Sequence, residues 1–385
     1  MKKTILTSAI SSLALSSAIN VQAQSFDELV DQSHIDVNFR YRVESANIDD
    51  ATDKDSALAN TLKSRVTFKS GSVAGFSVLV EGDNVVHVTE DFNSTKNNET
   101  AYDVVKDPET TQINQAYVQY KNDNNTVTLG NQRINLDNQR HVGGVAFRQD
   151  EQTFDAVSLI NTSIDKTTII AGFANNVNTI TNDNAELDVT ILNVKYAVSP
   201  ELSATTFYYG AEDTSGETLN TLGLRATGKI ESIQYEAEVA SQTESLADTS
   251  TLYYNLSAAT EVAGIKAKLG LEVFGSDNGD AAFSTPLGTN HKFFGWSDAY
   301  LSGAGTNGIQ DLNLSAATKV NGIKLVAQLH KFDAVEGSND LGTELGLLAA
   351  KKFGAYGASI KVAQLTSSDI TDDTTKLWLT GTTKF

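Results

Sequence analysis

Alternation of apolar and polar residues with a period of two runs along nearly the whole chain. From Ile35 to Glu44 every second residue is apolar, and the residues between are Asp, Asn, Arg and Glu. The same pattern recurs at 62–69, 233–239, 265–273 and 323–330. Successive side chains of a β-strand point to opposite faces, so the pattern predicts strands. These segments are about nine to eleven residues long, the length of a tilted strand that crosses a bilayer, whereas sandwich strands are shorter.

The connections between these segments alternate between short and long. Short turns are expected at 71–74, 121–125, 162–166, 198–201, 228–232, 261–264, 319–322 and 351–354. Long loops are expected at 45–56, 86–110, 131–152, 175–186, 211–219, 242–250, 275–309, 333–340 and 366–373. This order predicts an all-β fold: a single transmembrane antiparallel β-barrel of about 18 strands, with short periplasmic turns and long extracellular loops. Sixteen strands is the fallback, because the pattern at 153–161 is weak.

The two ends of the chain fit export to an outer membrane. Residues 1–23 have a basic start, a short apolar stretch and small residues before a cleavage point, which predicts a signal peptide. Residues 24–33 would form a short periplasmic tail, and residues 34–385 the barrel. The last segment alternates and ends in Phe385, as do barrels that present their final strand to the barrel-assembly machinery.

Charge and cysteine content exclude several classes of protein. The chain has 48 acidic and 29 basic residues, which argues against nucleic acid as a partner. It has no Cys, so it has neither a disulfide framework nor a thiolate metal site. The nine expected loops hold 29 acids and 7 bases. We therefore expect the acidity to face outward, where lipopolysaccharide, the membrane lipid and divalent cations are the neighbours.

Several segments resemble bacterial outer-membrane porins of the alginate-export type, a family of monomeric eighteen-stranded barrels. They lie at 37–44, 112–120, 130–140, 148–156 and 283–296. The resemblance implies a water-filled channel for passive diffusion of small hydrophilic solutes, with anionic solutes or acidic saccharides as candidates. The arginine-rich channel of that family is partly mirrored, because six of the seven Arg residues lie in the first 150 residues.

Charged side chains on the polar faces of the strands are the candidates for the channel lining. The expected cations are Arg40, Arg42, Lys63, Arg65, Lys69, Arg133 and Arg225, and the expected acids are Glu81, Asp83, Glu236, Glu238, Glu272 and Glu344. Guanidinium groups bind carboxylates in a planar fork, so a wall of arginines would favour anionic solutes. The alternative is that these charges pair across strands and only stiffen the wall.

Two of the long loops hold candidates for a constriction. Arg140 and Arg148 lie in the loop at 131–152, which could fold into the barrel. His291, Phe293 and Trp296 lie in the 35-residue loop at 275–309, where they would form an inward plug or a surface on which sugar rings stack. The same aromatic residues could instead be a loop core or part of the girdle at the membrane interface.

Catalytic signatures are missing from the sequence. It contains no HExxH, GxSxG, phosphate-binding loop or HxH pair, so we expect no enzymatic activity, no cofactor and no metal site. The main alternative to a porin is a binding barrel, an adhesin or receptor that acts through its long loops. An outer-membrane hydrolase is a further alternative.

Overall fold

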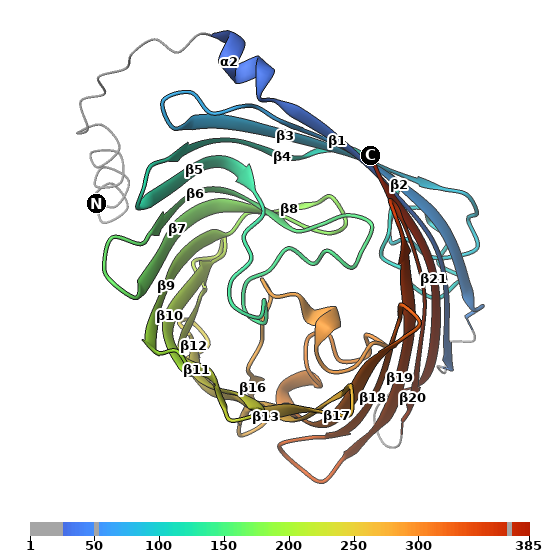
Figure 1. Ribbon diagram of the computed structural model, residues 1–385. Coiled ribbons are helices and arrows are strands. Elements are labelled where there is room, and N and C mark those ends of the chain that lie inside the picture. Colours follow the sequence, from blue (N-terminus) through green and yellow to red (C-terminus); the bar gives the residue numbers. More distant parts are fainter. Residues whose placement is uncertain (1–25, 50–53, 368–371) are drawn as a thin grey trace.

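A computed structural model describes residues 26–49, 54–367 and 372–385, in which eighteen long antiparallel strands form one closed barrel (Figure 1). The expected signal peptide, residues 1–23, lies outside the described residues. The barrel strands are β1 (His34–Asp49), β2 (Ala57–Lys69), β3 (Phe76–His87), β4 (Thr110–Lys121), β5 (Asn125–Gln132), β6 (Thr153–Asn161), β7 (Thr167–Asn178), β9 (Asp188–Ser199), β10 (Leu202–Glu212), β11 (Thr218–Ile230), β12 (Ile233–Glu244), β13 (Thr249–Val262), β14 (Ile265–Phe274), β17 (Ile309–Val320), β18 (Ile323–Asp333), β19 (Asp340–Phe353), β20 (Tyr356–Thr366) and β21 (Asp373–Lys384).

The first and last strands close the barrel. β1 pairs with β2 on one side and with β21 on the other, in a register that runs from Asn38 opposite Lys384 to Asp49 opposite Asp373. The predicted all-β barrel and the count of eighteen are confirmed. The weak segment at 153–161 is β6, which pairs with both β5 and β7, so the fallback of sixteen strands is wrong.

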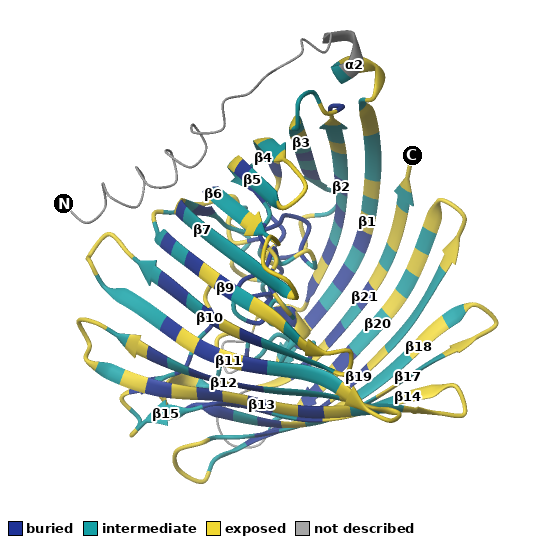
Figure 2. Ribbon diagram, turned by 60° about the vertical axis from the view of Figure 1, so that its left-hand side comes forward, coloured by how far each residue is buried: buried dark blue, intermediate teal, exposed yellow. Residues whose placement is uncertain are grey.

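The period of two separates an apolar outer face from a polar inner face. Outward-pointing residues such as Ile35, Val66, Leu129 and Leu222 are exposed, whereas the polar residues between them turn inward and are more buried. The bands of exposed and buried residues alternate along the strands in Figure 2. Because lipid covers the outer face, exposed aliphatic side chains are stable there.

Several strands extend further at the extracellular end than the sequence predicts. The strands β1, β10, β11, β12 and β13 continue into the expected loops at 45–56, 211–219 and 242–250. The residues that point outward in these extensions are polar, so the apolar outer face stops before the strand does. Backbone pairing continues past the membrane because each added residue pair satisfies peptide groups that would otherwise need water.

Shorter elements lie at the periplasmic end and inside the loops. Helix α2 (Phe26–Asp31) precedes β1. The loops contain β8 (Asn184–Ala185), β15 (Ser276–Asp277), β16 (Ala281–Ala282) and the 3-10 turns η1 (Asn290–Lys292) and η2 (Gly305–Asn307). Among the helices of the described residues, none has the length and hydropathy needed to cross a membrane.

Candidate channel constriction

Two extracellular loops fold into the barrel and meet there. They are the β5–β6 loop (residues 133–152) and the β14–β17 loop (residues 275–308), whose green and orange traces lie inside the ring of strands in Figure 1. The Gly143 N–H and the Gln152 amide both donate to the Leu287 carbonyl, at 2.9 and 2.8 Å. The Thr289 N–H donates to the Gln139 carbonyl at 2.8 Å. These bonds join the two loops into one internal structure that narrows the channel.

One ion-pair cluster fixes the β5–β6 loop to β2 and β3. Arg65 forms a two-pronged contact with Asp83, at 2.7 and 2.6 Å, and a further bond to Glu151 at 2.9 Å. Arg133 bonds to the same Glu151 and, at 3.1 Å, to Glu81. Lys63 and Asp83 are 2.9 Å apart, so three cations alternate with three carboxylates in a buried network. Such charge-assisted pairs have strict geometry and hold the loop in one position.

A second cluster fixes the same loop to β1. The two Arg148 nitrogens bond to the two Glu44 oxygens at 3.0 and 3.1 Å, and Arg148 also reaches Asp298 of the β14–β17 loop at 3.1 Å. Arg40 and Arg42 donate to the carbonyls of residues 146, 147 and 148. Within the described part of the chain, neither Arg40 nor Arg42 forms an ion pair with a carboxylate.

The opposite wall carries its own charged anchors. Arg140 is fully buried, bonds to Glu272 at 2.7 Å, and lies 4.4 to 4.5 Å from the centres of the rings of Phe274, Phe293 and Phe294. Further contacts on this wall join Arg225 to Glu236 at 2.8 Å and His141 to Glu238 at 2.6 Å. Aromatic faces attract a guanidinium, so Arg140 is held by both charge and stacking.

Lys361 of β20 is a central residue that the sequence analysis missed. Its ammonium donates to His291 Nε2 at 2.5 Å, and the other ring nitrogen of His291 donates to Asp298 at 2.5 Å. It also lies over the rings of Phe147, Trp378 and Trp296, at 3.9, 4.6 and 5.0 Å. These groups come from both inward loops and from β21. The alternation of β20 could have placed Lys361 inside, but no local signal pairs it with these rings.

Most residues expected at the channel wall or constriction lie inside the barrel. Those in the ion-pair clusters or bonded to the inward loops are Arg40, Arg42, Lys63, Arg65, Glu81, Asp83, Arg133, Arg140, Arg148, Arg225, Glu236, Glu238, Glu272, His291 and Glu344. Phe293 packs on Arg140 and Trp296 faces Lys361. Lys69 stands apart, exposed at the periplasmic end of β2.

The expectation that loop acidity faces outward is wrong for part of the loops. Asp107, Asp150, Glu151 and Asp298 belong to expected loops, yet all four are buried or nearly buried within the barrel. Asp107, Glu151 and Asp298 pair with arginines, whereas Asp150 accepts a hydrogen bond from the Gln112 amide. Composition alone could not separate loop residues that face outward from those that fold inward.

Comparison with known proteins decides the family. The family model for alginate export matches residues 31–359, most of the chain. The chain belongs to the alginate export family. It is an outer-membrane porin, in agreement with the barrel, the lipid-facing apolar band and the inward loops. Among curated proteins, none matches its sequence.

Solved structures share the fold of this porin at low sequence identity. The crystal structure of Pseudomonas aeruginosa OccK3 (OpdO) matches with a TM-score of 0.73 and 13% identity, over 95% of this chain and 99% of that one. The structure of Pseudomonas aeruginosa OccK9 (OpdG) matches with a TM-score of 0.72 and 14% identity, over 93% of this chain and 100% of that one. The structure of Acinetobacter baumannii OccAB4 matches with a TM-score of 0.68 and 12% identity, over 94% of this chain and 100% of that one. The whole barrel is therefore common to these proteins.

Two adjacent acids of the porin's β5–β6 loop have opposite pKa shifts. Burial acts to raise the pKa of Glu151, but Arg65, Arg133 and Lys63 outweigh it and lower the pKa to about 2. Burial raises the pKa of Asp150 to about 7. The attraction of Lys63 offsets only part of this effect, and the negative charges of Asp83 and Glu151 add to it. Asp150 is 1% exposed, and its Oδ2 has no hydrogen-bond partner among the described residues. Glu151 is therefore ionised at neutral pH, while Asp150 is partly protonated.

The wild-type protein should lose stability as the pH rises, because buried Asp150 resists ionisation. Asp150→Asn should abolish this loss, because asparagine stays neutral at every pH. The raised pKa means that the folded protein binds this proton more tightly than the unfolded chain, so the stabilisation is complete below about pH 4 and is lost as pH passes 7. The difference amounts to at most about 4 kcal/mol. Melting temperatures in detergent should match for wild type and Asp150→Asn at about pH 4, and the variant should melt progressively higher than wild type as the pH rises to 8.

Asparagine is a matched replacement because its carbonyl can still accept the Gln112 amide and the Glu151 N–H, now 2.5 and 2.8 Å from Asp150. Parallel melting curves for the two proteins between pH 5 and pH 8 would show that Asp150 does not titrate in this range.

Proposed function

We propose that this porin prefers small anionic solutes and takes them up from its periplasmic mouth. The observation that supports the proposal most directly is a cavity of about 690 Å³ beneath the β5–β6 loop. Its charged lining consists of five cations, Arg40, Lys63, Arg65, Lys352 and Lys384, and three carboxylates, Asp36, Glu81 and Glu151. The lining is net positive although the whole chain is strongly acidic. Low-dielectric walls focus such a charge and raise the local concentration of anions.

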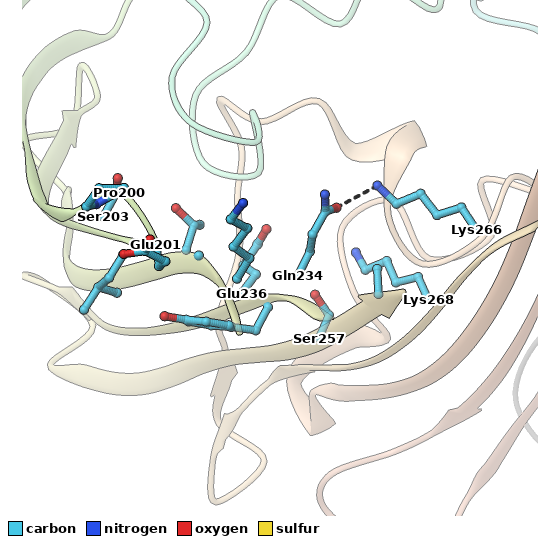
Figure 3. Close-up of a pocket in the computed structure, with 14 residues that line it drawn as sticks. Pro200, Glu201, Ser203, Gln234, Glu236, Ser257, Lys266 and Lys268 are labelled. Carbon is cyan, nitrogen blue, oxygen red and sulfur yellow. Dashed lines mark hydrogen bonds between the residues drawn. The ribbon is translucent and has the colours of Figure 1, made fainter. Parts of the chain in front are cut away.

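A second periplasmic cavity has the same sign of charge. It measures about 520 Å³ and lies on the β10–β14 wall (Figure 3). Lys229, Lys266 and Lys268 are its cations, and Glu201 and Glu236 its acids. Lys266 donates to Gln234 at 2.9 Å, the dashed contact of Figure 3. Its remaining hydroxyl and amide groups are suited to hydrogen bonding with a polar solute.

Acidic saccharides are the candidate solutes. A uronate carries both a carboxylate, which lysine and arginine bind, and hydroxyls, which Gln234 and the serines of the second cavity could bind. The description of the family, alginate export, points to the same chemical class. The cations that are paired at the constriction act mainly as anchors. The preference comes from cavity cations that form no ion pair among the described residues: Arg40, Lys352, Lys266 and Lys268.

Planar-bilayer recordings would test this proposal. In a salt gradient, wild type should give a reversal potential of anion-selective sign, and uronate oligomers added on the periplasmic side should block the current. Lys266→Gln with Lys268→Gln should reduce both effects. The control, Lys121→Gln with Lys166→Gln, removes the same charge from exposed periplasmic turns and should change neither. Cation selectivity in wild type would contradict the proposal, and a folded protein without conductance steps would favour a surface receptor.

We also propose that residues 1–23 are cleaved on export and that the porin has no enzymatic activity.

We further propose that the barrel-assembly machinery recognises Phe385. Phe385 extends the β21 pairing, because its N–H and carbonyl bond to Val37 at 2.9 and 3.0 Å, and its side chain is exposed. The barrel-assembly machinery could therefore contact the aromatic ring of Phe385 when it binds the last strand. Phe385→Ser should slow appearance of the heat-modifiable folded form in cells, and an unchanged rate would argue against this role.

A further inference from the structure

Three potential metal ligands converge at the extracellular end of β3, away from the channel constriction. They are His87, the last residue of β3, Glu90 in the loop that follows, and Glu109, immediately before β4. One ligand atom from each residue lies within 4.8 Å of the others. Histidine nitrogen with carboxylate oxygens is a common donor set for divalent transition metals.

The hydrogen bonds of His87 leave one ring nitrogen directed at this cluster. His87 Nε2 is 2.9 Å from the backbone carbonyl of Asp107, an acceptor only, so Nε2 carries the hydrogen. In a neutral imidazole Nδ1 then presents a lone pair. It faces both carboxylate oxygens of Glu90, at 3.3 Å each. A metal ion placed between these groups would be bound both by the Nδ1 lone pair and by the Glu90 carboxylate.

The surroundings of His87 are those of a metal ligand. A histidine that binds metal usually donates its other N–H to a carbonyl or carboxylate, which fixes the ring and its tautomer. Here the Asp107 carbonyl has that role. The ring packs edge-on against Phe92, with centroids 4.6 Å apart, and the side chain is only 2% exposed. The Asn97 amide donates to Glu90 at 3.2 Å and orients that carboxylate toward the ring.

The distances also fit a tetrahedral ion. With metal–ligand bonds of about 2.0 Å, two ligands of one zinc are ~3.3 Å apart. His87 Nδ1 and the Glu90 oxygens have that separation. Glu109 accepts the His87 N–H at 3.0 Å, and its ligand oxygen lies within 4.8 Å of the other two ligand atoms, so this exposed side chain has to move closer to complete the site.

We propose that His87, Glu90 and Glu109 bind one divalent transition-metal ion of the Zn²⁺ type, with water at the open position. The ion joins the end of β3 to the start of β4 and so clamps the base of the extracellular loop at residues 88–109. This proposal is independent of the solute that the channel carries. The sequence analysis predicts no metal site because ligands at these spacings match no common motif, and only the pairing of β3 with β4 brings Glu109 to His87.

Zinc titration of the untagged, folded porin in detergent would test the site. After chelator treatment and dialysis at pH 7.5, wild type should bind one Zn²⁺ per chain in competition with a chromophoric chelator. His87→Ala should weaken binding at least about tenfold, since even groups that only orient a ligand affect affinity by ten- to a hundredfold. Glu109→Gln should also weaken it, and its amide oxygen still accepts the His87 N–H, so the local backbone is preserved.

His34→Ala is the matched control. His34 lies 3.1 Å from Asp36 at the periplasmic end, so it is another histidine paired with a carboxylate, but the described residues place no third ligand beside it. This variant should bind Zn²⁺ as wild type does. Co²⁺ should give intense visible bands in wild type and lose them in His87→Ala. Absence of Zn²⁺ binding by wild type would show that the three residues do not form a metal site, and equal affinity in His87→Ala would place any bound metal elsewhere. Either result overturns the proposal.

Discussion

Replacement of Arg148 by alanine should widen the channel and destabilise the barrel at the same time. Arg148 bonds both to the wall, through Glu44, and to the second inward loop, through Asp298. Its guanidinium has a raised pKa despite burial, because Glu44, Asp107 and Asp298 surround it. Removing it leaves both oxygens of buried Glu44 without their guanidinium and takes one cation from Asp107 and Asp298, a change that costs about 3 to 5 kcal/mol.

The loop should respond by leaving the barrel, because its exit returns the carboxylates to water. We expect single-channel conductance to rise severalfold and the melting temperature in detergent to fall. Arg148→Lys keeps the charge but lacks the two-pronged contact, and it should lie between wild type and alanine. Lys96→Ala removes an exposed ion pair between two outer loops and should change neither quantity. Unchanged conductance in a destabilised Arg148→Ala protein would show that the loop does not narrow the channel.

The barrel itself could be predicted because one local pattern determines most of it. In a membrane, every backbone group needs a partner and every second side chain meets lipid, so alternation over the full length leaves few alternatives to a closed barrel. The same rule placed Arg40, Lys63 and Arg65 on the inner face. It failed at the extracellular strand ends, where β1 continues to Asp49. Past the membrane the outward-pointing residues of β1, Ser45, Asn47 and Asp49, are polar, so the apolar outer face ends while the pairing continues.

The partners of the inward residues could not be predicted from the sequence. Arg148 lies 104 positions from Glu44, and Arg140 lies 132 positions from Glu272, so each pair exists only because the loops fold back through the barrel. The sequence indicated which loops hold unusual cations and aromatic rings. It could not decide whether these arginines remain available to solutes or are neutralised, and the structure places carboxylates beside most of them. The role of Lys361 could not be predicted because the aromatic rings that it contacts, those of Phe147, Trp296 and Trp378, come from three separate segments.

Replacement of Arg140 by methionine should have a comparably large effect on the opposite wall. Arg140 is 0% exposed and, among the described residues, is the only cation that forms an ion pair with Glu272. Methionine keeps much of the contact with Phe274, Phe293 and Phe294 but leaves Glu272 buried and unpaired. We expect a loss of about 3 to 5 kcal/mol in stability, measured as a lower melting temperature in detergent.

A second substitution should recover most of that loss. In Arg140→Met with Glu272→Gln, the buried charge is gone and the glutamine can still accept the Tyr253 hydroxyl, now 3.1 Å from Glu272. Replacing both members of a buried pair is often close to neutral, whereas removing one is costly. The double variant should therefore melt well above the Arg140→Met protein and show the conductance of wild type. If the two substitutions were instead additive, the contribution of Arg140 would come from stacking between the rings rather than from neutralising Glu272.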